Sequence, residues 1–431
     1  MPSTARAVLI CLATIAAVAS HLHCQGVKAP MRPGIHVGIT EGDLVGRDHR
    51  VLQAAVDYVA GLGGGTVHLG PGEWLLRDSV RLRDGVALVG SGSATVLKKA
   101  PGISSALLED GDYGDVRVLP ADPDGFEVGD GVTVRSNTQS GFHSTVATVI
   151  RQDPDGALTL DGLLNSDFMV AHEATVSRAC PLIRGVDIAN VEVRDLVIDG
   201  NRPNCPPEDG CRGGGFNLLR VANVHLANLT LRNLNGDGLS YQNCPDVTVE
   251  GCTFEDNAGG GCHPGSGSAR PIVRNCTMRR NGGCGIFVCW RVKNGRFEDN
   301  VIEDNGQMGI SIGHKDTDNT FVGCQVRRNG YCGVYFRDEP EHSGGHRCTV
   351  EECLIEDNGT AGAYADQPPA GIRVDGHTND ILLRKNRIRD TRTEGKTQAY
   401  GVLINVDAGP VELEGNETEG HAKGDVLDLR R

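Results

Sequence analysis

Side chains able to bind or transform a substrate gather in five short segments of this chain. The segments read NGDGLSYQ, NAGGGCHPGS, NGGCGIFVCWR, NGQMGISIGHKD and NGYCGVYFRDE, and they lie between residues 235 and 339. The candidate catalytic residues are His263, Arg291, His314, Lys315 and Asp316. The candidate substrate-binding residues are Asp237, Gln242, Ser266, Trp290, Tyr335, Arg337 and Glu339. Because these residues recur at one phase of successive segments, we expect a fold that stacks them into a column.

This set of side chains suits β-elimination on a uronic-acid polymer. That reaction needs a group to neutralise the carboxylate, a base for the C5 proton and a donor to the leaving oxygen. Arg291 and Arg337 offer paired N–H groups to a carboxylate. His314 or Lys315 is the expected base, with a pKa lowered by crowding between cations. C5-epimerisation uses the same groups and returns the proton to the opposite face.

Other assignments stay open at this point. The proton donor is either His263 or Tyr335. Glycoside hydrolysis instead needs two carboxyl groups about 5 to 9.5 Å apart, and Asp316 with Glu339, one segment apart, is the more credible pair. A non-catalytic cell-surface or glycan-binding protein is a third hypothesis. It would carry similar aromatic and polar residues on every segment, with no concentration on a few of them. The concentration of His, Trp and Lys on three segments favours an enzyme over this third hypothesis, and among the enzymes we prefer the elimination or epimerisation type.

The spacing of the segments predicts the fold that positions them. Their opening glycines are Gly238, Gly261, Gly285, Gly309 and Gly333, at intervals of 23 or 24 residues. A repeat of this length is typical of a solenoid. Apolar residues alternate in short runs within each repeat, and no run has room for a helix. We therefore predict an all-β chain that coils into a parallel β-helix.

Two columns of polar or small residues are expected inside this solenoid. Their members would lie one above another where successive coils bend, and Asn side chains there satisfy backbone groups in tight turns. The first column is Cys252, Cys276, Asn300, Cys324 and Cys353, and the second is Asn257, Asn281, Asn305, Asn329 and Asn358.

Residues 1–24 are predicted to be a cleaved signal peptide. Arg6 precedes an apolar run over 7–19 that ends in small residues, as in a secretory leader. The run is too short for a transmembrane span. Lipid anchoring at Cys24 is an alternative, although His23 is a poor match for the small residue expected before a lipidated cysteine. The protein is accordingly expected to be secreted or periplasmic.

The rest of the chain divides into three parts. Residues 36–101 are expected to form an N-terminal cap and the first coils, with a helix over 51–62 that ends at a run of glycines. Residues 102–180 interrupt the repeat with strands joined by Asp-Gly turns, which indicates a small β insertion. Residues 181–431 resume the coils.

Charge and cysteine content limit the partners. The formal charge is −14, which argues against nucleic acid or an anionic membrane as the main partner. We expect a polysaccharide substrate, a monomer and no certain cofactor, with Ca²⁺ held by Asp316, Asp318 and Asp338 as an alternative. Cys205 and Cys211 look like the best local disulfide pair in an oxidising compartment. No cysteine or histidine set has zinc-like spacing.

These features resemble one known superfamily. The opening segment over 47–99 and the coils resemble the pectate-lyase-like right-handed β-helix proteins, which include pectate and alginate lyases, mannuronan C5-epimerases and polygalacturonases. The run GCHP at 261–264 is similar to the G-F-D-P-H run of the epimerases, with His263 where that family has Asp. GISIGHKD is similar to the G-H-G region of polygalacturonases, whose paired Asp-Asp motif has no match here. The resemblance implies a right-handed β-helix with polysaccharide along one sheet, without choosing the reaction.

Overall fold

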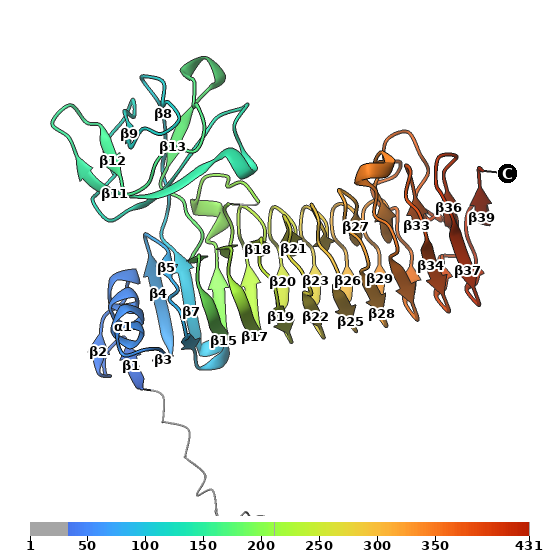
Figure 1. The fold of residues 1–431 in the computed structure, drawn as a ribbon, viewed down its shortest axis with the longest axis horizontal. Coiled ribbons are helices and arrows are strands. Elements are labelled where there is room, and N and C mark those ends of the chain that lie inside the picture. The colour runs from blue at the N-terminus through green and yellow to red at the C-terminus, as the bar shows by residue number, and fades with distance from the viewer. Residues whose placement is uncertain (1–32, 211, 431) are drawn as a thin grey trace, which may run out of the picture. The chain divides into compact units, whose positions relative to one another are not determined.

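The computed structural model describes residues 33–210 and 212–430, so the predicted leader and Cys211 lie outside the described residues. Gly34–Arg431 form one compact unit. In this unit the chain winds into successive coils, with a helix at the N-terminal end and a separate group of strands beside the first coils (Figure 1). The described residues contain no helix long and apolar enough to cross a membrane.

The helix covers the N-terminal end of the solenoid. Helix α1 spans His49–Gly61, close to the helix predicted over 51–62. The side chain of Asp48 accepts a hydrogen bond from the backbone N–H of Arg50 and so caps the helix. Its apolar side chains pack into the main core, which would otherwise be open to water at this end. The buried ones are Leu52, Ala55, Val56 and Val59.

Most strands belong to one parallel sheet of 22 members, which forms the walls of the solenoid away from the site. Its strands are β1 (Gly34–Gly38), β2 (Leu44–Val45), β3 (Gly65–Leu69), β4 (Gly72–Leu76), β6 (Val86–Val89), β7 (Thr95–Lys99), β15 (Ala189–Asp199), β17 (Ala222–Arg232), β19 (Val247–Glu250), β20 (Thr253–Glu255), β22 (Ile272–Arg274), β23 (Thr277–Arg279), β25 (Arg296–Glu298), β26 (Val301–Glu303), β28 (Thr320–Val322), β29 (Gln325–Arg327), β31 (Thr349–Glu351), β32 (Leu354–Glu356), β34 (Ile381–Arg384), β35 (Arg387–Arg389), β37 (Val411–Glu414) and β38 (Glu417–Glu419).

A second parallel sheet of eleven strands carries the segments singled out by their chemistry. Its strands are β5 (Val80–Arg81), β14 (Ile183–Val186), β16 (Phe216–Leu219), β18 (Leu239–Gln242), β21 (Cys262–Gly265), β24 (Ile286–Phe287), β27 (Ile310–Ile312), β30 (Val334–Phe336), β33 (Ala370–Val374), β36 (Tyr400–Ile404) and β39 (Gly424–Asp428). We call it the eleven-stranded sheet.

The register of the eleven-stranded sheet confirms the predicted repeat. Cys262 pairs with Ile286, Ile286 with Ile310, and Ile310 with Val334, and each residue directly follows one of the evenly spaced glycines. All four side chains are fully buried in the main core. Alternate residues of the same strands therefore face outward, as the pleat of a strand requires.

Residues between the first and later coils form a separate antiparallel sheet with its own apolar core. Figure 1 shows this group standing off the N-terminal coils. Its strands, in spatial order, are β8 (Ser104–Ala106), β13 (Thr175–Ser177), β10 (Gly131–Arg135), β11 (Thr145–Gln152), β12 (Leu158–Leu160) and β9 (Arg117–Val118). The described residues also contain five short 3₁₀ turns, namely η1 (Gly92–Ala94), η2 (Gly141–His143), η3 (Val170–His172), η4 (Arg202–Asn204) and η5 (Glu341–Ser343).

Both predicted interior columns are present. In the first, the backbone N–H of Cys252 donates to Cys276 Sγ at 3.4 Å, and that of Cys276 donates to Asn300 Oδ1 at 3.0 Å. In the second, Asn257 Nδ2 donates to Asn281 Oδ1, and Asn281 Nδ2 to Asn305 Oδ1, both at 2.9 Å. The twelve described cysteines are all free thiols. Cys205 is one of them, and its predicted partner lies outside the described residues.

Replacing Asn281 by alanine is expected to lower the free energy of unfolding by about 3 kcal/mol, because each buried polar group left unpaired costs roughly 1–3 kcal/mol. Asn281 donates to Phe254 O and to Asn305, and it accepts from the backbone and side chain of Asn257. Urea unfolding measures the change. Asn204→Ala is the matched control, since Asn204 is exposed and makes one side-chain hydrogen bond. Equal effects of the two substitutions would contradict a stabilising role for the Asn column.

Candidate active site

The outward face of the eleven-stranded sheet brings the segments of the sequence together. A row of side chains crosses successive strands through Ser240, His263, Phe287, Ser311 and Tyr335. The residues after each strand end form a second line along one edge of this face. Two pockets lie on these lines, one around His263 and one around His314.

The His263 pocket has a volume of about 320 Å³ and holds a histidine–carboxylate pair. Asp237 Oδ2 lies 2.8 Å from His263 Nδ1, and Asp237 Oδ1 accepts a hydrogen bond from the backbone of Gly260. With Asp237 ionised, Nδ1–H is the donor, and this tautomer leaves a lone pair on Nε2. Nε2 is shielded from water and has no hydrogen-bond partner. An imidazole oriented in this way is prepared to accept a proton.

Asp209 adds a second carboxyl group to the wall of this pocket. Its Oδ1 lies 3.6 Å from Arg135 of the inserted sheet, whereas its Oδ2 is buried without a partner. The loop that carries it is anchored by a buried ion pair between Glu208 and Lys99. Glu208 also accepts a hydrogen bond from the backbone of Gly214. The loop is thereby fixed on the first coils, which places Asp209 opposite the coil of His263.

The His314 pocket, about 400 Å³, holds a second histidine–carboxylate pair. His314 Nε2 lies 2.5 Å from Glu339 Oε1. Its other nitrogen, Nδ1, lies 3.4 Å from both Arg337 Nη2 and Cys289 Sγ. Burial and the Arg337 guanidinium hold the pKa of His314 below its usual value, against the smaller opposing effect of Glu339. Both nitrogens of His314 are already engaged, so neither has a free lone pair to accept a proton.

Two cationic side chains in the His314 pocket have no partner among the residues that the structure describes. Arg291 and Lys315 are exposed, line the pocket, and make no ion pair or side-chain hydrogen bond with any described residue. Elsewhere in the solenoid, arginines pair with carboxylates on the adjacent coil, as Arg280 does with Asp256 and Arg328 with Asp304. An unpaired pair of neighbouring cations attracts an anionic ligand.

Unusual backbone conformations present these groups. Trp290 and Arg291 have φ of 68° and 65°, and His314 and Lys315 have φ of 51° and 69°. Consecutive non-glycine residues in the left-handed region are costly and cluster at functional sites. The backbone N–H of Arg291 donates to His314 O at 2.9 Å, so the two turns stack. The stack places Arg291 and Lys315 side by side.

Arg337 and Asp316 form the support beneath this pocket. Asp316 is fully buried, and it accepts hydrogen bonds from the backbone of Val292 and Gly313 and from Arg337. Arg337 also donates to Ser311 and lies 4.8 Å from the ring centroid of Phe287. The structure thus turns Asp316 inward, where it positions Arg337 and cannot meet a substrate. Its pairing with Glu339 for hydrolysis is not formed.

The stability contributed by Asp316 is expected to fall as pH rises. Burial raises the pKa of Asp316 from 3.8 to about 7. Between these values the folded state keeps a proton that the unfolded chain releases, so the free energy of unfolding decreases with pH. The difference in unfolding free energy between wild type and Asp316→Asn should fall by a few kcal/mol, at about 1.4 kcal/mol per unit, across this window. Urea unfolding at several pH values measures it.

Asp318→Asn provides a control of opposite sign. The adjacent Arg347 guanidinium lowers the pKa of Asp318. Its contribution to stability is present above the unfolded-state pKa and is lost as pH falls. The contrary result is a difference in unfolding free energy between wild type and Asp316→Asn that rises with pH, as the difference for Asp318→Asn does. It would show that Asp316 is ionised in the folded protein.

Three other predicted residues lie beneath the surface. Tyr335 is almost fully buried, its hydroxyl donates to Asp375 at 3.2 Å, and its ring contacts Tyr364. Burial holds the pKa of Tyr335 above its usual value, so this phenol is a poor acid. Gln242 and Ser266 are also buried and line neither pocket. The exposed aromatic ring above Tyr335 belongs to Tyr364, which the sequence analysis did not single out.

The inserted sheet reaches the site through one turn. Phe142 in η2 lies 6.3 Å from the ring of Trp290, and Trp290 packs edge-on against His314. Gly141, the neighbour of Phe142, lines the His263 pocket. Arg212 donates two hydrogen bonds to Phe142 O at 3.0 and 3.3 Å. Residues of this turn and of the Asp209 loop together form a wall of the His263 pocket.

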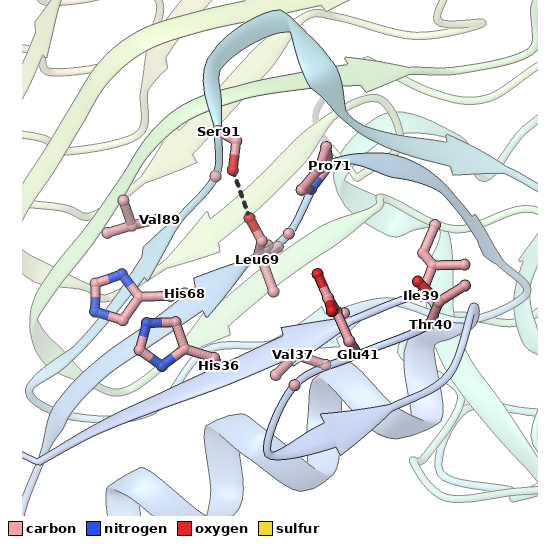
Figure 2. A pocket seen from close by; sticks show the side chains of 14 residues that line it. His36, Val37, Ile39, Thr40, Glu41, His68, Leu69, Pro71, Val89 and Ser91 are labelled. Carbon is pink, nitrogen blue, oxygen red and sulfur yellow. Dashed lines mark hydrogen bonds between the residues drawn. The ribbon is translucent and has the colours of Figure 1, made fainter.

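A larger pocket of about 560 Å³ lies on the first coils, away from these residues. Figure 2 shows its His36 and His68 side by side, with ring centroids 4.7 Å apart, while Glu41 lies nearer Thr40. Ser91 donates to Leu69 O within this pocket. No lysine or arginine lines this pocket. Asp43 Oδ2 lies 3.6 Å from His36 Nδ1, but both side chains are exposed, so the pocket holds no buried histidine–carboxylate pair like that of His263.

The carboxylates considered for Ca²⁺ are not gathered at one point. Asp316 is bound by Arg337, and Asp318 is paired with Arg347 at 2.7 Å. In the described part of the chain, no group of three or more His, Cys, Asp or Glu side chains has the arrangement of a metal site.

Comparisons with known proteins agree with the fold. A family model described as right handed beta helix region matches residues 183–343. The chain is 23% identical over 271 residues to mannuronan C5-epimerase AlgE6 of Azotobacter vinelandii, and this match covers 63% of the chain and 22% of that protein. The chain thus spans about a fifth of the length of this curated relative.

Two solved structures have similar backbones. The A-module of Azotobacter vinelandii mannuronan C-5 epimerase AlgE4 aligns with a TM-score of 0.54 at 17% identity, covering 91% of this chain and 100% of that one. A polygalacturonase from Erwinia carotovora ssp. carotovora aligns with a TM-score of 0.57 at 12% identity, covering 94% and 98%. The repeats, the register and these likenesses together confirm that the chain has a right-handed parallel β-helix fold.

Proposed function

We propose that this protein acts on a uronic-acid-containing polysaccharide by removing the proton at C5, with β-elimination or C5-epimerisation as the outcome. The observation that carries the proposal is the cation pair Arg291 and Lys315 in the His314 pocket, which lies on the same face of the solenoid as the His263 pocket, where a histidine has an unoccupied nitrogen. The proteins of similar fold include mannuronan C5-epimerases and a polygalacturonase, which supports a polysaccharide substrate.

In this proposal Arg291 and Lys315 bind the carboxylate of one sugar residue and neutralise its charge. Neutralisation stabilises the negative charge that develops when the C5 proton leaves. His263 Nε2, which is covered in this structure and must become accessible to the substrate, accepts that proton, and Asp237 holds the imidazole in the correct tautomer and stabilises the imidazolium formed. The structure thus favours His263 for the role that the sequence analysis gave to His314 or Lys315, because His263 has an unoccupied ring nitrogen and His314 has none.

The pair of His314 and Glu339 is the candidate proton donor. His314 lies two coils from His263 and three residues beyond its register partner Ser311, so the two backbone positions are roughly 14 Å apart, which leaves room for a sugar residue between the two imidazoles. In β-elimination the electron pair of the C5–H bond forms the C4–C5 double bond, the C4–O bond breaks, and the leaving oxygen takes a proton from this pair. In epimerisation the same pair returns a proton to C5 from the opposite face.

Hydrolysis is the second candidate because Asp209 and Asp237 line the same pocket. Two carboxyl groups on either side of a glycosidic bond are the usual requirement for that reaction. Against it, Asp237 already accepts hydrogen bonds from His263 and from the backbone of Gly260.

The test incubates the purified protein with a panel of uronate polymers and follows ultraviolet absorbance and reducing ends in parallel. A rise in absorbance reports the unsaturated product of elimination. Reducing ends without absorbance would replace the elimination proposal with hydrolysis. Silence in both assays, with no change in the C5 configuration by NMR, would leave only glycan binding. We further infer that the protein is secreted through its N-terminal leader and that it is a monomer. Its presence in the culture medium tests the first inference, and size-exclusion chromatography of that medium tests the second.

A further inference from the structure

A separate pocket of about 280 Å³ lies between the first coils and the inserted sheet. Arg81 from β5 and Arg184 from β14 form its solenoid wall, and Val146 from β11 and Gly162 after β12 form the opposite wall. It shares no residue with the His263 or His314 pockets.

Arg184 has most of its hydrogen-bonding capacity unused. Its Nη1 donates to Val146 O at 3.1 Å, while its Nε is shielded from water and has no partner. It forms no ion pair with any residue that the structure describes. A guanidinium carries five N–H donors, and removing one from water is costly unless it meets an anion. Burial and the neighbouring Arg81 lower the pKa of Arg184, which agrees with an uncompensated charge.

The carboxylates around Arg184 already form ion pairs with other arginines. Arg81 lies 2.7 Å from Asp161 and 3.7 Å from Asp78, and Arg83 at the rim lies 2.8 Å from Asp57. Arg184 is therefore the member of this group that lacks a carboxylate partner. Its planar fork matches two oxygens of a carboxylate or a phosphate.

We propose that this pocket binds a small oxyanion, a carboxylate or a phosphate group, through Arg184. Arg184 lies in the same outward row as His263, and the register runs from Arg184 through Asn217 and Ser240 to His263. Three strand spacings separate the two, about 14 Å. The oxyanion is supplied by a uronate residue of the polysaccharide, which rests on the proposed function, or by a free inorganic anion, which does not.

Calorimetric titration of the full chain with sodium phosphate tests the site without requiring turnover. Arg184→Met is expected to weaken binding about 10- to 100-fold, the usual effect of losing hydrogen bonds to a charged group. Gly162→Val should weaken it similarly by filling the pocket, since an added Cβ meets only Ala147 Cβ at 4.0 Å. Arg220→Met, at an exposed arginine outside the pocket, should leave it within about 2-fold. Thermal melts check that each variant folds.

A second titration identifies the source of the oxyanion. It compares mannuronate hexamers with carboxyl-reduced neutral hexamers. If Arg184→Met weakens binding of the charged hexamer alone, the pocket takes a sugar carboxylate. If it weakens phosphate binding and leaves the hexamer unchanged, the pocket takes a free anion. Unchanged binding of both probes in Arg184→Met and Gly162→Val would overturn the proposal. Arg184 would then have only a structural role, as the donor of a hydrogen bond to the Val146 carbonyl. Absence of turnover in the wild type would count against the proposed function alone.

Discussion

Replacing His263 by glutamine is expected to lower kcat for removal of the C5 proton by about 10²- to 10⁴-fold, the usual contribution of a positioned base. The reason is that Nε2 of His263 is an oriented and unoccupied proton acceptor, whereas glutamine has no basic nitrogen. KM should change little, because Arg291 and Lys315 bind the substrate carboxylate. Steady-state kinetics on the polymer that the panel identifies provides both values.

Two variants control this result. Asp237→Asn should also lower kcat strongly, because an amide does not hold the imidazole in the required tautomer. His225→Gln should leave kcat unchanged, since His225 lies on β17 of the other sheet and pairs with Glu250 at 2.8 Å. A His263→Gln protein with wild-type kcat would remove His263 from the mechanism and return the role of base to His314 or Lys315.

Neutralising the cation pair is the second large effect. The double variant Arg291→Met with Lys315→Met should lower kcat/KM on a uronate polymer by about 10- to 100-fold, because two charge-assisted contacts to the carboxylate are lost. The loss should shrink as salt is added, since both side chains are exposed and screened. Kinetics at low and high ionic strength measures it.

Lys293→Met is the matched control for this double variant. Lys293 is exposed and has no ion pair among the described residues, but it does not line the His314 pocket. Its substitution should leave kcat/KM near the wild-type value. Equal losses in the control and the double variant would mean that overall charge, and not the His314 pocket, attracts the polymer.

The fold followed from the sequence because its determinants are local and repeated. Glycines such as Gly261 and Gly285 recur at a fixed interval. Each one directly precedes a strand whose first residue is buried. Asn257 and Asn281 recur at a second phase and bond to each other across coils. In a solenoid each coil contacts mainly its neighbours, so a period in the chain becomes a period in space.

The site was only partly predictable, because burial at the strand ends depends on loops outside the repeat. Asp316 and Tyr335 occupy promising positions in the sequence, yet one side chain points inward and the other is covered by Tyr364. Asp209 was missed because it lies on the long loop before the periodic region. Its only signal was the length of that loop, and its position depends on the buried contact of Glu208 with Lys99.

The choice between the two histidines also required the structure. Spacing along the chain shows that His263 and His314 lie two coils apart, but not which nitrogen atoms are occupied. Glu339 and Arg337 engage both nitrogens of His314. His263 is held by Asp237 at one nitrogen only.

The most direct test of C5 proton removal is deuterium incorporation. The wild-type protein is incubated with a uronate polymer in D₂O, and NMR measures deuterium at C5 in recovered sugar residues together with the signals of unsaturated ends. Unsaturated ends, or deuterium at C5 of intact residues, that depend on His263 are the expected result. A polymer that is cut or bound with neither change at C5 would contradict proton abstraction as the function of this site.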